Sequence, residues 1–115
     1  MKIDPLIITH FVGLVRIHHF PDTQAELVTF ADSLIDKLGL TVLGKNSYAF
    51  TPIGNTLVYI LSQSHLSVHT WPEYNLMHVD LVSCKALQKD EFTSALKSSL
   101  ESYTIEEVEI KEHII

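Results

Sequence analysis

The sequence has a single cysteine, only eight lysines and arginines, and no long apolar run. One cysteine cannot form an internal disulfide, which fits a protein of the reducing cytoplasm. The basic residues are scattered and the formal net charge is -6, which argues against a nucleic-acid partner because that partner needs clustered positive charge. No segment approaches the apolar length that spans a bilayer, and the apolar start breaks too early, within residues 1–5, for a signal peptide. We therefore expect a cytoplasmic protein without a membrane contact.

The chain also lacks linkers, internal repeats and low-complexity segments. Its 115 residues, 46% apolar and 19% charged, are typical of a globular protein. We expect one domain over residues 1–115, long enough to bury most of the surface that the unfolded chain exposes.

Hydrophobic periodicity predicts strands and helices in alternation. Thr23 and Glu26 have the spacing of a capping box, apolar residues then recur at helical spacing up to Leu38, and Gly39 supplies a stop. A second helix is expected to be capped by Asp90. Strands are expected at 7–17, 41–43, 47–51, 56–61, 66–71, 76–83 and 104–110, with turns at 44–46 and 52–55.

Each helix needs a sheet face on which to bury its apolar stripe. Two helices on one face of a mainly antiparallel sheet satisfy that need, so the expected fold is α+β, a two-layer α/β sandwich. The other sheet face is left to solvent or to a second copy of the chain.

Reactive side chains are concentrated in residues 62–74, Ser-Gln-Ser-His-Leu-Ser-Val-His-Thr-Trp-Pro-Glu-Tyr, with Cys84 following. His65 and His69 would lie on one face of a strand, but about 13 Å apart at strand rise, too far to share an ion. His78 offers a third imidazole without an evident fourth ligand, so we expect no metal site. Cys84, considered alone, is typical of a quiet buried thiol.

Considered together, these residues resemble prokaryotic S-adenosylmethionine decarboxylase, a self-processing pyruvoyl enzyme. That family carries Glu-Ser-His-Leu, then Ile-His-Thr-Trp-Pro-Glu-Tyr, then an Asp and a Cys. The corresponding residues here are 63–66, 68–74, Asp80 and Cys84. The length and the order of elements fit as well, and neither core packing nor turn chemistry requires such a string.

The chemistry of such a site has a physical logic. Decarboxylating an α-amino acid leaves a carbanion, which needs an electron sink conjugated to the amine, and no natural side chain has the required ketone. A cofactor such as PLP can supply a carbonyl, or the chain can make one from a serine. In that second route the serine hydroxyl attacks the preceding peptide carbonyl, and elimination from the resulting ester leaves a pyruvoyl group.

The resemblance implies a role for each group in processing. Cleavage would fall between Gln63 and Ser64, giving a β chain of residues 1–63 and an α chain of residues 64–115 that begins with the pyruvoyl cofactor. His69 would take the proton that drives elimination, Thr56 would provide the hydroxyl that holds the processing intermediate, and Cys84 would return a proton to the substrate.

The resemblance also implies a substrate site and a partner. Phe50 would stack on the adenine of S-adenosylmethionine, Glu73 would hold the ribose hydroxyls, and Leu61 would line the site. Electron-rich rings also suit a sulfonium substrate. The family divides these groups across a homodimer interface, which would take Ser64 and Cys84 from one protomer and Phe50, Thr56, His69 and Glu73 from its partner. The product would be the aminopropyl donor for spermidine.

The sequence departs from the family pattern at four points. Gln63 replaces the usual glutamate, Lys85 follows Cys84 where glycine is common, and the Gly-x-His opening is missing although His10 remains. The chain is also continuous through Ser64. These departures leave two alternatives open, a decarboxylase of arginine or ornithine and a processing-dead homologue that binds a ligand or regulates a partner.

Overall fold

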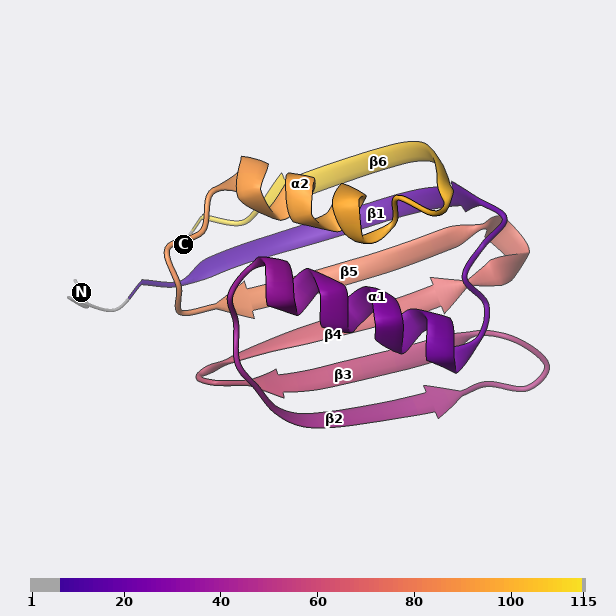
Figure 1. Cartoon of the computed structure of the whole chain (residues 1–115), viewed down its shortest axis with the longest axis horizontal. Coiled ribbons are helices and arrows are strands. Elements are labelled where there is room, and N and C mark those ends of the chain that lie inside the picture. The colour runs from indigo at the N-terminus through magenta and orange to yellow at the C-terminus, as the bar shows by residue number, and fades with distance from the viewer. Residues whose placement is uncertain (1–6, 115) are drawn as a thin grey trace.

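The computed structural model describes residues 7–114 of the chain (Figure 1). Its elements are, in chain order, β1 (Thr9–His18), α1 (Gln24–Lys37), β2 (Val42–Ala49), β3 (Asn55–Leu61), β4 (Ser64–Trp71), the 3-10 turn η1 (Pro72–Tyr74), β5 (Leu76–Ser83), α2 (Lys89–Ser99) and β6 (Thr104–Glu112). The expectation about a leader at residues 1–5 lies outside the described residues. Within residues 7–114, neither helix is long and apolar enough to cross a membrane.

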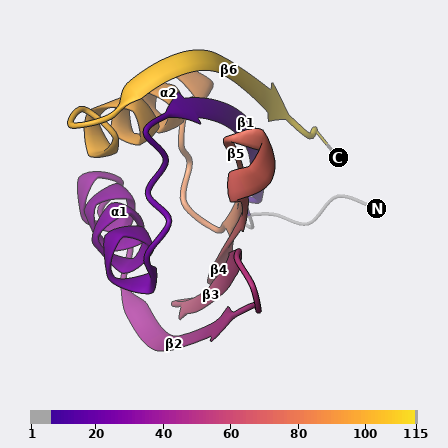
Figure 2. The same cartoon turned by 90° about the vertical axis from the view of Figure 1, so that its right-hand side faces the viewer.

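The six strands form one sheet in the order β2-β3-β4-β5-β1-β6, and every neighbouring pair is antiparallel. Both helices lie on one face of this sheet, which curves around them (Figure 2). The expected two-layer α+β sandwich is therefore confirmed. The opposite, convex face carries no covering element among the described residues, and we call it the open face.

The core lies between the helices and the sheet because apolar side chains recur at the spacing of each element. In α1 the buried positions are Leu27, Phe30, Ala31, Leu34 and Ile35, and in each central strand alternate residues are buried. Phe11 of β1 stacks on Phe92 of α2 with ring centroids 5.1 Å apart. This alternation assigns every second strand residue to the open face.

The start and end of α1 follow the expected signals. The Glu26 N–H donates to Thr23 Oγ1 at 3.1 Å, and the Thr23 hydroxyl donates to Glu26 Oε1 at 2.9 Å. Gly39 has φ +67°, the left-handed conformation that ends many helices and that glycine adopts without steric cost. The local sequence therefore determines both ends of this helix.

Two expectations about the elements were wrong. Residues 41–51 do not form two short strands around a turn at 44–46, because Gly44, Lys45 and Asn46 pair with β3 within the single strand β2. Tertiary pairing thus overrides the turn propensity of these residues. In α2, Gln88 rather than Asp90 occupies the N-cap position, and its N–H donates to Glu91 Oε1 at 2.9 Å. Asp90 lies in the first turn, where a carboxylate favours the helix dipole.

Candidate active site

The proposed cleavage position lies at the tip of the β3–β4 hairpin. Leu61 pairs with Ser64, so Ser62 and Gln63 form a two-residue turn between the strands. Gln63 has φ +56°, in the left-handed region that costs a non-glycine residue roughly 1–2 kcal/mol. The bond that processing would break therefore follows a residue whose backbone is strained.

Ser64 and Cys84 meet at this tip although 20 residues separate them. The Cys84 N–H donates to Ser64 Oγ at 3.1 Å, and the Ser64 hydroxyl donates to the Ser62 carbonyl at 3.2 Å. The Cys84 thiol lies 3.8 Å from the same carbonyl. We call Ser62, Gln63, Ser64 and Cys84 the tip cluster. It joins the residue proposed to become the cofactor to the thiol proposed as proton donor.

A second group of predicted residues meets at the other end of the same hairpin. Thr56 pairs with His69 across β3 and β4, and Thr56 Oγ1 lies 2.5 Å from His69 Nδ1. Two buried residues fasten the strands beside them, since the Asn55 N–H donates to Thr70 Oγ1 at 2.9 Å and Thr70 Oγ1 donates to the Asn55 carbonyl at 3.4 Å. The hydrogen bond at Nδ1 fixes the orientation of the His69 ring.

Aromatic rings surround His69. Its ring centroid lies 4.1 Å from that of Trp71 and 5.8 Å from that of Phe50, and Tyr48 is 4.9 Å from Phe50. We call Phe50, Thr56, His69 and Trp71 the His69 cluster. Phe50 is 44% exposed and Trp71 is 37% exposed, so both rings remain available to a flat, electron-poor or cationic ligand.

The surroundings of His69 favour its neutral form. Burial lowers the pKa of the His69 imidazole below its ordinary value, the nearby His78 lowers the pKa further, and the Glu73 carboxylate opposes both by raising it. His78 lies directly opposite His69 on β5. A neutral imidazole can accept a proton at neutral pH, as a processing base must.

The residues expected to hold substrate lie in different environments. Phe50 follows β2, and its N–H donates to the Gly54 carbonyl at 2.8 Å. A Cβ at Gly54 would lie 3.3 Å from the Thr70 carbonyl, so glycine lets this loop approach β4 closely. Glu73 is exposed in η1. Leu61 is only 2% exposed and belongs to the core, and its role at the substrate stays a prediction.

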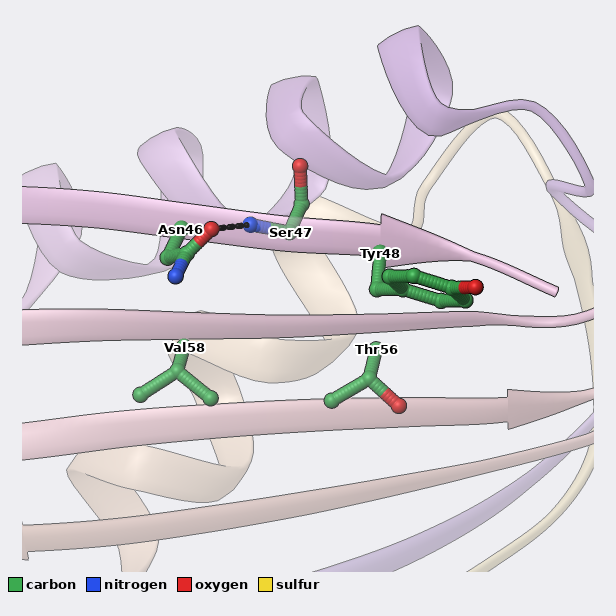
Figure 3. Close-up of a pocket in the computed structure, with 5 residues that line it drawn as sticks. All are labelled: Asn46, Ser47, Tyr48, Thr56 and Val58. Carbon is green, nitrogen blue, oxygen red and sulfur yellow. Dashed lines mark hydrogen bonds between the residues drawn. The ribbon is translucent and has the colours of Figure 1, made fainter.

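A shallow pocket of about 200 Å³ adjoins the His69 cluster on the open face. It is lined by Asn46, Ser47, Tyr48, Thr56 and Val58 (Figure 3). Asn46 pairs with Val58 and Tyr48 with Thr56, so these four side chains share one face of the two strands. The pocket places apolar and hydroxyl groups beside the ring of Phe50.

One chain does not bring the tip cluster and the His69 cluster together. Ser64 and His69 are five residues apart on β4, which corresponds to about 17 Å at strand rise. Their side chains also project from opposite faces of the sheet, because five is an odd number of residues. Within residues 7–114 no group of three or more His, Cys, Asp or Glu side chains could hold a metal ion.

Tyr48 and Trp71 were not expected in or beside the His69 cluster, and His78 was considered only as a metal ligand that could approach across a hairpin. Tyr48 and His78 pair with Thr56 and His69 respectively, and Trp71 lies two residues after His69 on the same strand face. The period-2 pattern of β4 could have revealed Trp71. The position of Tyr48 opposite Thr56 depends on the continuous strand β2, which the turn propensity of residues 44–46 argued against.

The comparisons with known proteins agree with this fold. The model of the S-adenosylmethionine decarboxylase family matches residues 14–113. Three curated relatives named S-adenosylmethionine decarboxylase proenzyme come from Archaeoglobus fulgidus, Thermodesulfovibrio yellowstonii and Thermoplasma volcanium. The first is 36% identical over 65% of this chain and 65% of its own length. The second is 32% identical over 79% of this chain and 64% of its own length. The third is 47% identical over 64% of this chain and 62% of its own length.

The crystal structure of the adenosylmethionine decarboxylase from Aquifex aeolicus superposes with a TM-score of 0.80 at 22% sequence identity, covering 96% of this chain and 93% of that one. At this identity the likeness shows the fold. The chain spans 61–65% of the length of the first three curated relatives it matches. Since the family model matches most of the chain, the protein belongs to the S-adenosylmethionine decarboxylase family.

Proposed function

We propose that this protein is a self-processing, pyruvoyl-dependent decarboxylase of S-adenosylmethionine that supplies the aminopropyl donor for spermidine synthesis. The observation that carries the proposal is the tip cluster, where the Cys84 N–H donates to Ser64 Oγ at 3.1 Å beside a strained Gln63. Membership of the family supports the substrate. We place the activity in the cytoplasm, as the single cysteine leads us to expect.

The geometry at the tip fits the conversion of Ser64 into a pyruvoyl group. The Ser64 hydroxyl would attack the Gln63 carbonyl, the peptide C–N bond would break, and an ester would join residues 63 and 64. Loss of the Ser64 α-proton and of the Gln63 carboxylate then gives dehydroalanine, and its tautomer takes up water and releases ammonia. The Ser62 carbonyl, 3.2 Å from Ser64 Oγ, polarises the hydroxyl for the first step.

A pyruvoyl group, once formed, supplies the carbonyl that accepts electrons from the departing carboxylate of the substrate. The chain's own residues would then bind and protonate. Phe50 offers a ring face to adenine and to the sulfonium charge, and the exposed Glu73 carboxylate can accept hydrogen bonds from ribose hydroxyls. The thiol of Cys84, which shares the Ser62 carbonyl with Ser64, is placed to return a proton.

A homodimer would complete each site, because one chain holds the tip cluster and the His69 cluster about 17 Å apart along β4. The open face supports such a partner. It exposes several large apolar side chains, and such exposed patches often mark a contact with another protein chain. Among them are Leu14, Val58, Ile60 and Trp71. In the proposed dimer, the His69 cluster of one protomer serves the tip cluster of the other.

Intact mass under denaturing conditions tests the processing step. The wild-type chain should separate into residues 1–63 and a pyruvoyl-blocked fragment starting at position 64, and Ser64→Ala should stay whole. A wild-type chain that remains uncut after long incubation would refute the enzyme and favour the processing-dead alternative. Release of carbon dioxide from S-adenosylmethionine, compared with arginine and ornithine, then decides the substrate.

Co-expression of two inactive variants tests the shared site. Ser64→Ala and His69→Ala should each fail to cleave alone, whereas a mixed dimer combines Ser64 from one chain with His69 from the other. With random association, about half of the His69→Ala chains should then be cut. Cleavage absent from the mixture, with mixed dimers verified by tagged pull-down, would contradict the division of the site between protomers.

A further inference from the structure

The residue after Cys84 is tied to three elements of the fold. The Lys85 N–H donates to Ser83 Oγ at 3.0 Å, and the Lys85 carbonyl accepts from Thr9 Oγ1 at 3.0 Å. The Lys85 ammonium donates to the Leu38 carbonyl at 2.8 Å. Strand β1, strand β5 and the end of helix α1 therefore all hold the same loop residue.

The backbone contacts of Lys85 use hydroxyls that the fold has buried. Ser83 is 1% exposed and Thr9 is 8% exposed, and buried hydroxyls are costly unless they are hydrogen-bonded. Because the Cys84 N–H donates to Ser64 Oγ, the Cys84 backbone is fixed on both sides. The position of the thiol then depends on its own χ1 rotation and on the stability of this loop.

The side chain of Lys85 connects the loop to the carboxyl end of α1. Leu38 is the C-cap of the helix, where carbonyls lack helical partners and the helix dipole favours a cation. A Cβ at Gly39 would lie 2.8 Å from Lys85 Nζ, so the ammonium occupies space that glycine leaves free. The Lys85 ammonium, the Leu38 carbonyl and Gly39 therefore pack closely together.

We propose that Lys85 is a positioning residue, which anchors the loop after β5 to the end of α1 and so holds the Cys84 thiol beside Ser62 and Ser64 in the tip cluster. The part of this inference that concerns turnover rests on the proposed function. Lys85 stands where the resemblance led us to expect glycine, so the anchor is a property of this chain's own sequence. Phe50 and Glu73, which we propose to hold the substrate, lie at the opposite end of the sheet, so the Lys85 anchor does not position them.

Three variants isolate the anchor. Lys85→Met keeps the length of the side chain and removes its charge and its donors, while Lys85→Arg keeps both. Lys37→Met is the matched control, because Lys37 is an exposed lysine in the last turn of the same helix and has no hydrogen bond or ion pair to the Cys84 loop among the described contacts.

The first readout is alkylation of Cys84, the chain's single cysteine, by iodoacetamide in the unprocessed Ser64→Ala background. The limiting rate at high pH, where it no longer depends on pH, should rise severalfold in Lys85→Met because the loop opens more often. It should stay at the background level in Lys37→Met and Lys85→Arg. Equal limiting rates in all four proteins would overturn the inference whatever the protein catalyses.

The second readout is turnover per folded, processed protomer. In Lys85→Met kcat should fall about 10- to 100-fold, since a displacement near 1 Å has that effect on a reacting group, whereas KM should stay within about twofold. Lys85→Arg should recover most of kcat. An unchanged kcat in Lys85→Met would refute the positioning role, and a wild-type protein that releases no carbon dioxide would refute the proposed function while the alkylation rates still decide about Lys85.

Discussion

Replacing Thr56 by valine removes one hydroxyl and preserves the shape of the side chain. The hydroxyl oxygen lies 2.5 Å from His69 Nδ1 in a partly buried position. Valine would leave that ring nitrogen without its partner, which costs about 1–3 kcal/mol. If the whole cost appears in the barrier to processing, cleavage slows about 5- to 150-fold. Valine keeps the β-branch and its strand preference, so the fold of the hairpin should survive.

The assay is a time course of intact mass after a short pulse of cell-free synthesis, which captures the precursor before it matures. Thr56→Ser keeps the hydroxyl and should process within a few-fold of wild type. Thr29→Val is the control for the substitution itself, because Thr29 is exposed on α1 and its hydroxyl only donates to the Ala25 carbonyl. If Thr56→Val matured as fast as Thr29→Val, the hydrogen bond to His69 would have no part in processing.

Three further substitutions test other contacts of the structure. His78→Gln removes a group that lowers the pKa of His69, so the pKa of His69 should rise. Because His69 must be neutral to act as a base, the pH below which the processing rate falls should move to a higher value in a pH series. An unchanged pH profile would contradict the coupling between the two histidines. Arg16→Met removes the donor that binds the Tyr74 carbonyl at 2.7 Å. Loosening the turn that carries Glu73 should raise KM several-fold with kcat nearly unchanged. A loss confined to kcat would contradict this role of Arg16 in substrate binding. Tyr103→Phe removes the 2.6 Å hydrogen bond to Glu26, which lowers the pKa of that carboxyl below its ordinary 4.5. We expect the free energy of unfolding, measured with urea, to fall by about 1 kcal/mol at pH 7. The loss should shrink as the pH falls below 4.5, because protonation of Glu26 removes the difference between the two proteins.

The sequence predicted the elements whose ends are determined locally. Thr23, Glu26 and Gly39 carry the capping and stop signals of α1, and these depend on residues within one or two turns. The strand at 76–83 was predicted with the bounds it has in the structure. Strand β2 was predicted as two short strands, 41–43 and 47–51, because Gly44, Lys45 and Asn46 have turn propensity. Only pairing with β3, together with the ion pair of Lys45 to Asp32 at 2.9 Å, keeps them extended.

The contacts within the candidate site depend on register, and the sequence contains that information only in part. Across the β3–β4 hairpin the numbers of paired residues add up to 125, as for Leu61 with Ser64 and Thr56 with His69. A turn at Ser62 and Gln63 would therefore have predicted the Thr56–His69 pair. Ser62 is a common turn residue but Gln63 is not, so the local sequence did not single out these two residues as the turn. The meeting of Ser64 with Cys84 depends further on the pairing of β4 with β5, which no local pattern specifies.

The same hairpin register links the two halves of the proposed site. A slip of one residue in β4 would move His69 from the open face to the helix face. It would also change the turn, so that Ser62 and Gln63 no longer form a two-residue loop before Ser64. The Thr56–His69 pair and the strained Gln63 therefore exist together or not at all. Because five residues of strand separate Ser64 from His69, no rotation of side chains can bring them into contact within one chain. If His69 acts on Ser64, as we propose, it must therefore act on the Ser64 of a second copy, and the co-expression experiment tests that requirement directly.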